Sequence, residues 1–198
     1  MPIRSCSFVV AVFAALALVA CQSKTAQPIA PTALQTRDSA ASWSAPLQSG
    51  TASAAEHAVT LFDACDPETF NAVLGPGACT RQGGIAFENF IEQLTRHHSI
   101  GAWHFAPSEV TMQVGQVLVA NNRGGEEHTF TEVEEFGGGV VDLLNNLVGL
   151  TTVAPECNQA VRIPAGASSS ETEDEAGVEK YQCCIHPWMR AEVRVKEK

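Results

Sequence analysis

Basic residues are few in this sequence, and none of them form a patch. Its 198 residues contain 12 lysines and arginines against 22 aspartates and glutamates, which gives a formal net charge of −10. Proteins that bind nucleic acid need clustered basic side chains to neutralise phosphates, so this class is excluded. The acidic balance favours either a basic partner or simple solubility.

Several cysteine motifs are also missing. The chain has seven cysteines but no Cys-x-x-Cys-His for haem attachment and no Cys-x-x-Cys for thiol exchange. A zinc site made of Cys, Cys and His would lack the paired spacing of such sites. No internal repeat is present either.

The N-terminal apolar run, Phe8 to Ala20, is too short to be a membrane span. With Arg4 before it, the run predicts a signal segment over residues 1–20. Its end, Leu18-Val19-Ala20-Cys21, resembles a bacterial lipobox, and this resemblance implies that Cys21 is lipidated. Gln22 in the next position implies a lipid-anchored protein at the periplasmic face of the outer membrane, in a cell with two membranes. The alternative is an ordinary cleaved signal with an unrelated cysteine; in both cases the protein is exported, which permits disulfides.

Residues 21–56 are rich in Ala, Ser, Thr, Gln and Pro and predict a disordered tether. Residues 57–102 predict a small helical extension. Asp66 and Pro67 are typical of a helix N-terminus, and this helix should end near Leu74. A second helix is expected over residues 86–98, because its apolar residues recur at helical spacing.

From Trp103 onward the apolar period shortens toward two. Alternation at 109–114 and at 128–133, with turn residues every eight to twelve positions, indicates short strands in a β-sandwich or barrel over residues 103–198. A short helix is expected at 142–148, inside an insertion.

Soft sulfur and imidazole groups come together in one stretch, Tyr181-Gln182-Cys183-Cys184-Ile185-His186-Pro187-Trp188-Met189-Arg190. Cys183, His186 and Met189 stand three residues apart. Such ligands select copper over magnesium or calcium, and two His and one Cys with a weak axial Met form a blue-copper electron-transfer site. One further histidine must come from elsewhere.

The stretch resembles the ligand loop of the cupredoxins, in which Tyr-x-Cys-x-x-His-Pro-x-Met runs into the last strand. The resemblance extends more loosely from Trp103 to the C-terminus, and it departs from the family at Ala191, where many members have Gly. It implies a mainly β, cupredoxin-like Greek-key sandwich or barrel with one type 1 copper. It also implies that His186 is the ligand at the solvent edge, inside an apolar docking patch of Ile185, Pro187 and Trp188.

The remaining ligand is predicted to be His128. The other candidates are His57, His97, His98 and His104. His128 stands about 55 residues before His186, between a polar loop and an alternating segment, which resembles the position of the first histidine in cupredoxins. Many members have an Asn after this residue that braces the ligand loop. Here it is Thr129, so the brace is either weaker or made by the hydroxyl.

Cys183 is preferred to Cys184 as the ligand because Cys-x-x-His matches the family, and because adjacent strand residues face opposite ways. Four cysteines then remain, which allow three pairings: Cys65, Cys79, Cys157 and Cys184. A bond from Cys65 to Cys79 closes a short loop, and a bond from Cys157 to Cys184 would pin the insertion to the copper loop. Free buried thiols are the alternative.

The function expected from the resemblance is one-electron transfer in the periplasm, by a protein that is not an enzyme and is a monomer. Copper carriage or storage, and a structural module, are the rival functions. Acidic residues precede the ligand loop at 171–179 and flank His128 at 126–135. If both segments border the copper end, their field would steer a basic partner such as a cytochrome.

Overall fold

The computed structural model describes residues 56–198. The predicted signal segment, the lipidation site Cys21 and the predicted tether up to residue 55 lie outside the described residues. Within residues 56–198, no helix combines the length and apolar composition needed to span a bilayer.

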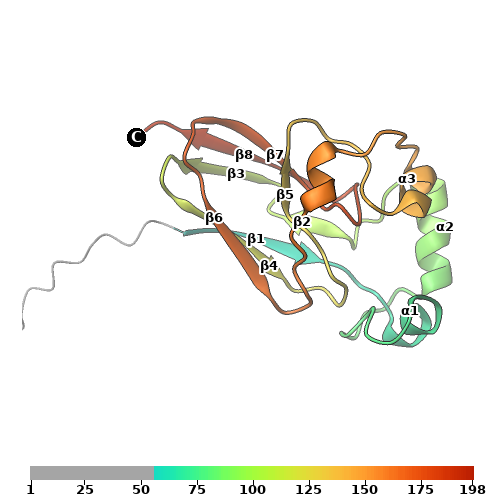
Figure 1. Ribbon diagram of the computed structural model, residues 1–198. Coiled ribbons are helices and arrows are strands. Elements are labelled where there is room, and N and C mark those ends of the chain that lie inside the picture. Colours follow the sequence, from blue (N-terminus) through green and yellow to red (C-terminus); the bar gives the residue numbers. More distant parts are fainter. Residues whose placement is uncertain (1–55) are drawn as a thin grey trace, which may run out of the picture. The chain divides into compact units, whose positions relative to one another are not determined.

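Two four-stranded sheets face each other in a β-sandwich (Figure 1). The first has the strand order β2-β1-β4-β6 and the second the order β3-β8-β7-β5. The first sheet consists of β1 (Glu56–Phe62), β2 (His104–Ala106), β4 (Val117–Asn122) and β6 (Ser168–Thr172). The second consists of β3 (Glu109–Gln113), β5 (Thr131–Val133), β7 (Gly177–Gln182) and β8 (Arg190–Lys196). Both sheets are mixed, because β1 pairs with β4 and β3 pairs with β8 in parallel.

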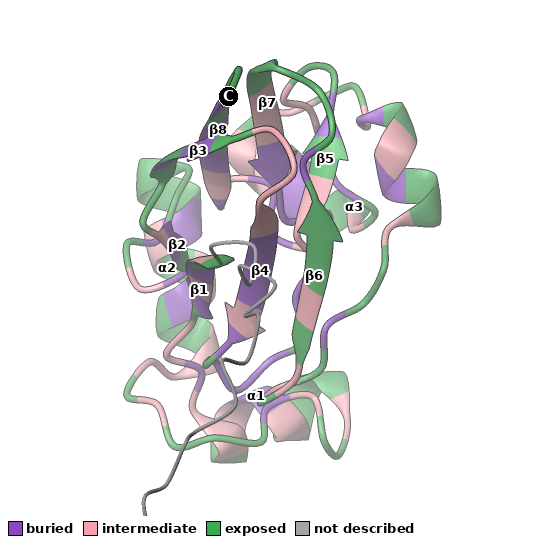
Figure 2. Ribbon diagram, turned by 90° about the vertical axis from the view of Figure 1, so that its left-hand side faces the viewer, coloured by how far each residue is buried: buried purple, intermediate pink, exposed green. Residues whose placement is uncertain are grey.

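Side-chain alternation places the core between the sheets. In β3 the apolar residues Val110 and Met112 are buried, and the polar residues that alternate with them are exposed. The same alternation in β8 buries Val193 and Val195. Figure 2 shows that β4 is mostly buried whereas the edge strand β6 is mostly exposed. The predicted mainly β sandwich is therefore observed.

Three α-helices gather at one end of the sandwich (Figure 1). They are α1 (Pro67–Leu74), α2 (Phe87–His97) and α3 (Asp142–Val148), and a short 3₁₀ helix, η1, covers Pro155–Gln159. The predicted cap of α1 is present, because the Asp66 side chain accepts a hydrogen bond from the Thr69 backbone N–H at 3.0 Å. α3 ends at Gly149, whose φ of 75° suits glycine.

Residues 57–102 contain more than the predicted helices. The segment begins within β1, which pairs with β4 over six positions and so belongs to the first sheet. This strand is not predicted by the sequence. Its position matters because the residues directly after β1 reach the candidate site described below.

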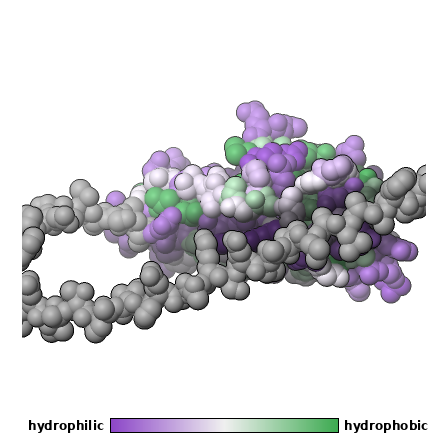
Figure 3. All heavy atoms as spheres, turned by 90° about the horizontal axis from the view of Figure 1, so that it is seen from below, coloured by the Kyte–Doolittle hydropathy of each residue, from purple (hydrophilic) through white to green (hydrophobic). Residues whose placement is uncertain are grey.

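The visible surface is mixed in character. On the face shown in Figure 3, hydrophobic side chains of the described residues form small separate patches among hydrophilic ones.

Candidate metal centre

The predicted ligand loop connects β7 to β8 at the end of the sandwich where the helices lie (Figure 1). Two backbone hydrogen bonds close it. The N–H of Cys183 donates to the carbonyl of Met189 at 3.0 Å, and the N–H of Met189 donates to the carbonyl of His186 at 2.9 Å. Met189 is buried. These bonds hold the backbone at all three predicted ligand positions of the loop.

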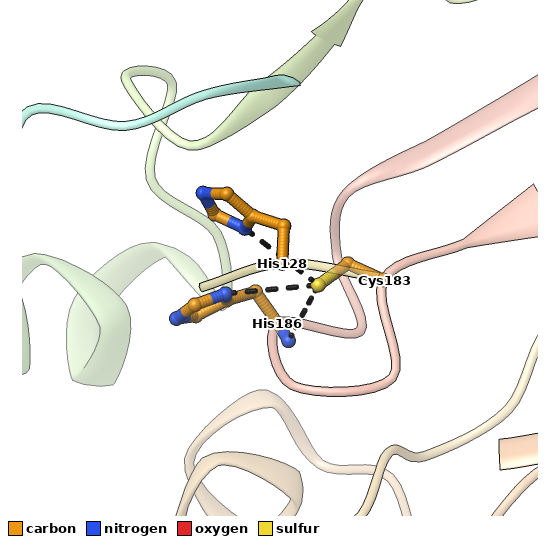
Figure 4. A group of neighbouring side chains, drawn as sticks. All are labelled: His128, Cys183 and His186. Atoms are coloured by element: carbon orange, nitrogen blue, oxygen red, sulfur yellow. Dashed lines mark hydrogen bonds between the residues drawn. The ribbon is translucent and has the colours of Figure 1, made fainter. Parts of the chain in front are cut away.

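Three of the four predicted ligands converge on one point. The Nδ1 atoms of His128 and His186 each lie 3.7 Å from Sγ of Cys183 (Figure 4). The side chains come from two segments, since His128 lies just before β5 and pairs with Ile163 in an isolated bridge. Cys183 and His128 are 0% exposed and His186 is 2% exposed.

The sulfur of Cys183 lies among hydrogen-bond donors. The backbone N–H groups of Thr129 and His186 both point to Sγ at 3.4 Å. Burial raises the pKa of this thiol, but the two neighbouring imidazoles lower it more, so its pKa is well below the ordinary value. The arrangement favours a thiolate, the form of cysteine that binds metals.

Thr129 braces the loop through its hydroxyl. Its Oγ1 accepts a hydrogen bond of 2.7 Å from the backbone N–H of Cys184, and the side chain is fully buried. Of the two possibilities left by the sequence, the structure therefore shows the hydroxyl brace.

Asp63, which is not among the predicted site residues, forms a hydrogen bond with the outer nitrogen of His128. The distance from Nε2 to Oδ2 is 2.9 Å and both side chains are buried. Burial raises the pKa of Asp63, but His128 and two backbone N–H groups lower it to about 2. Burial lowers the pKa of His128, whereas the contacts with Asp63 and Cys183 raise it to about 9 in the metal-free protein. No local motif marks Asp63, because its role depends on the pairing of β1.

The position of His186 differs from the expectation. The resemblance implies a ligand at the solvent edge, yet His186 is enclosed. Its Nε2 lies 3.6 Å from Oε2 of Glu126, a residue only 7% exposed, whose same oxygen accepts a 2.7 Å hydrogen bond from Nε1 of Trp103. Burial raises the pKa of Glu126. Glu126 is therefore part of the site and not part of a solvated acidic surface.

The helices account for this enclosure. An apolar cavity of about 160 Å³ adjoins His186 and Glu126, and residues of α1, α2 and α3 form most of its wall, among them Phe70, Phe90 and Leu144. The predicted open patch of Ile185, Pro187 and Trp188 is not observed, since Pro187 is buried and the other two are partly covered. Trp188 contacts Phe90 of α2, with ring centroids 6.1 Å apart. The two helices of the predicted extension, α1 and α2, together with α3, thus form a helical lid over the ligand loop.

The other candidate histidines are not at the centre. His57 contacts Gln116, and His98 contacts the carbonyl of Leu147. His104 is exposed and stacks on Phe62. His97, at the end of α2, is also exposed.

Both predicted disulfides are present. Cys65 bonds to Cys79, and Cys157 bonds to Cys184. Cys184 is bonded to Cys157 and is not at the centre, as predicted, although both cysteines follow the end of β7 and do not belong to the strand. Cys183 is the free cysteine of the described residues.

The acidic segments do not both border the centre. Glu173 to Glu175 lie in the turn before β7, whereas Cys183 follows the other end of that strand (Figure 1). Glu173 is itself buried and accepts a hydrogen bond from the Tyr181 hydroxyl at 3.0 Å. Glu127 and Glu135 are paired with Arg162 and Lys180.

The donor set fits a metal ion. For zinc, metal–nitrogen and metal–sulfur bonds are about 2.0 and 2.3 Å, so two such ligands of one ion lie roughly 3.6–3.8 Å apart. The two separations of 3.7 Å agree with that requirement. Two imidazoles and one thiolate, with a methionine on the same loop, are the ligand types of a blue-copper site.

Comparisons with solved structures give partial similarities. The chain is similar to a purple cupredoxin from Nitrosopumilus maritimus, at 20% identity over 49% of this chain and 86% of that chain, with a TM-score of 0.36. It is also similar to amicyanin from Paracoccus versutus, at 21% identity over 50% of this chain and 77% of that one, with a TM-score of 0.33. No protein-family model matches the sequence, and a search of curated proteins gives no match.

Proposed function

We propose that this protein is a cupredoxin-like type 1 copper protein that transfers single electrons. The thiolate of Cys183 and the Nδ1 atoms of His128 and His186 would hold the copper, with Met189 as a weak axial ligand. The observation that carries the proposal is one buried sulfur flanked by two imidazole nitrogens at 3.7 Å. Bound copper would accept one electron from a reduced partner and pass it to an oxidised one.

The residues around the centre suit this task. Two backbone N–H groups hold the sulfur, Asp63 holds one imidazole, and the Thr129 hydroxyl holds the loop. Ligands fixed in this way would move little if a bound copper ion changed its oxidation state. The enclosure of both imidazoles would also keep solvent from a bound ion.

A cysteine hydrolase is disfavoured by the same geometry. Cys183, His128 and Asp63 stand in the order thiol, imidazole, carboxylate, which resembles a nucleophilic triad. A nucleophile must reach its substrate, and Cys183 is 0% exposed. A second imidazole on the sulfur has no role in such a triad, whereas a metal site needs it.

Copper carriage is the competing function. Export and anchoring to a membrane would suit both carriage and electron transfer. In our proposal Cys21 carries a lipid and the copper domain works at the periplasmic face of the outer membrane, with a redox protein as its partner. A carrier must release its metal, so an enclosed site favours electron transfer over carriage.

The test is the visible spectrum of the protein after addition of Cu(II). An intense blue band from thiolate-to-copper charge transfer is expected. Cys183→Ser should abolish the band. The double variant Cys157→Ser with Cys184→Ser should keep it, because Cys184 faces away from the centre. Equal loss in the single and double variants would refute the ligand assignment, and a colourless wild-type protein would refute the copper site.

A further inference from the structure

Each imidazole of the centre lies between the thiolate and a buried carboxylate. The Nδ1 atoms of His128 and His186 face Cys183, and their Nε2 atoms face Asp63 at 2.9 Å and Glu126 at 3.6 Å. One carboxylate thus lies at the outer edge of each ring, at hydrogen-bond distance for Asp63 and at the longer ion-pair distance for Glu126.

Asp63 is held in place from several sides. Its Oδ1 accepts hydrogen bonds from the N–H groups of Gly125 at 2.9 Å and Cys65 at 3.2 Å, and its Oδ2 accepts one from Glu126 at 3.0 Å. Gly124 permits this close approach, because a Cβ at that position would collide with the carboxylate. Four donors around one buried carboxylate stabilise its charged form.

Glu126 is positioned by the helical lid. Trp103 donates to its Oε2 and is itself packed against Phe70 of α1 and Phe90 of α2, with ring centroids 6.0 and 4.9 Å apart. Glu126 thus depends on the part of the chain that encloses His186. Its neighbour Glu127 is exposed and pairs with Arg162 at the surface.

A metal on Nδ1 leaves the proton of each neutral imidazole on Nε2, where it faces the carboxylate. Partners of this kind orient the ring and make the ligand nitrogen more basic. The negative charge also lies in a buried environment, where charges interact more strongly than in water. Both effects favour a doubly charged metal ion over a singly charged one.

Resting on the proposed copper site, we propose that Asp63 and Glu126 are positioning residues that orient the two imidazoles and lower the reduction potential of the copper by stabilising Cu(II) over Cu(I). Glu126 connects this effect to the lid, so that the helices would set the potential as well as exclude solvent.

The test compares Glu126→Gln and Asp63→Asn with the wild-type protein, all loaded with copper. The control is Glu127→Gln, which removes the same charge one residue away at the surface. Removing a partner of a metal ligand typically weakens metal binding roughly 10- to 100-fold. We expect the Cu(II) dissociation constant to rise by this factor and the Cu(I) constant to rise less. A tenfold difference between the two corresponds to an increase in potential of about 59 mV for one electron.

The wild-type spectrum is measured first, which separates the two proposals. Without a blue band, the copper site fails and the tuning proposal fails with it. With a blue band, unchanged potentials in both variants would refute the tuning role alone, even if thermal stability falls. An equal increase in Glu127→Gln would also refute it, since the effect would then be a general loss of charge. Asp63→Asn replaces one of the two oxygens that accept backbone hydrogen bonds. If this variant does not fold, Glu126→Gln decides, because glutamine can still accept from Trp103.

Discussion

At the scale of single residues, Thr129 joins the segment of His128 to the ligand loop. Its backbone N–H points to the sulfur of Cys183, and its hydroxyl accepts from the N–H of Cys184. A single residue therefore contacts both neighbours in the cysteine pair. This explains how a threonine can brace the loop in place of an amide side chain.

Replacing Thr129 tests the brace. Thr129→Ala leaves the buried N–H of Cys184 without an acceptor, which should cost about 1–3 kcal/mol of stability. Thr129→Ser keeps the hydroxyl and should retain most of the stability. Chemical denaturation of the metal-free variants measures the difference. Equal stability of the alanine and serine variants would mean that the hydroxyl contributes nothing.

A second group of residues surrounds the hydroxyl of Tyr181, away from the centre. The hydroxyl donates to Glu173 at 3.0 Å and contacts Glu179 at 3.3 Å. Burial and the neighbouring Glu173 and Glu132 raise the pKa of Glu179 to about 8. Between pH 4.5 and about pH 8, the folded protein thus keeps a proton on Glu179, whereas the unfolded chain, with the ordinary pKa of 4.5, has released it.

This difference predicts a pH dependence of stability. Because the folded state binds the proton more tightly, the stability of the metal-free protein should fall as the pH rises from about 4.5 to about 8. Glu179→Gln should raise the melting temperature at pH 8 and reduce the slope. Glu109→Gln, an exposed site on β3, is the control and should keep the wild-type slope. A slope unchanged in Glu179→Gln would assign the pH dependence to other groups.

At the scale of elements, the insertion between β5 and β6 packs closely against the ligand loop. The disulfide from Cys157 joins it to Cys184, and the N–H of Val140 donates to the carbonyl of Cys184 at 2.7 Å. Gly139 lies so near that a Cβ there would overlap the Cys184 carbonyl. The insertion therefore supports the side of the loop that faces away from the metal.

Gly139→Ala tests this contact. The added methyl group meets backbone atoms that cannot rotate away, so we expect a loss of about 1–3 kcal/mol, as for overpacking in a core. We also expect a shift of the blue band, because the displaced Cys184 adjoins Cys183. Gly101→Ala, where the methyl group meets no atom within 4 Å, is the control. A wild-type spectrum and stability in Gly139→Ala would show that the contact is easily relieved.

The elements also show which features the sequence could predict. The cap of α1, the alternation of β3 and the spacing of the ligand loop are local patterns, and the structure contains all three. The strand β1 and the burial of Glu126 depend on partners about 60 and 23 residues away, and no local pattern marks them. His186 was expected at the surface because the resemblance begins only near Trp103. It therefore does not include α1 and α2, which help to cover His186 in the structure.

At the scale of the whole molecule, charge and enclosure act together. The full chain carries a net charge of −10, and its exposed acidic residues are spread over several segments instead of forming a ring around His186. Attraction of a basic partner should therefore depend on the overall field more than on one local patch. Such steering is screened by salt, because the Debye length is only about 8 Å at physiological ionic strength.

The rate of reduction by small one-electron reagents tests both electron transfer and this field. With a cationic reductant the rate should fall as salt rises, and with an anionic reductant it should rise, since screening removes attraction in one case and repulsion in the other. Stopped-flow loss of the blue band measures both rates on the same protein. Glu134→Gln, which removes one exposed negative charge, should weaken the salt dependence slightly. Fast reduction that is indifferent to salt would refute steering but leave the copper protein intact. Reduction too slow to measure with either reagent, at every salt concentration, would favour copper carriage over electron transfer.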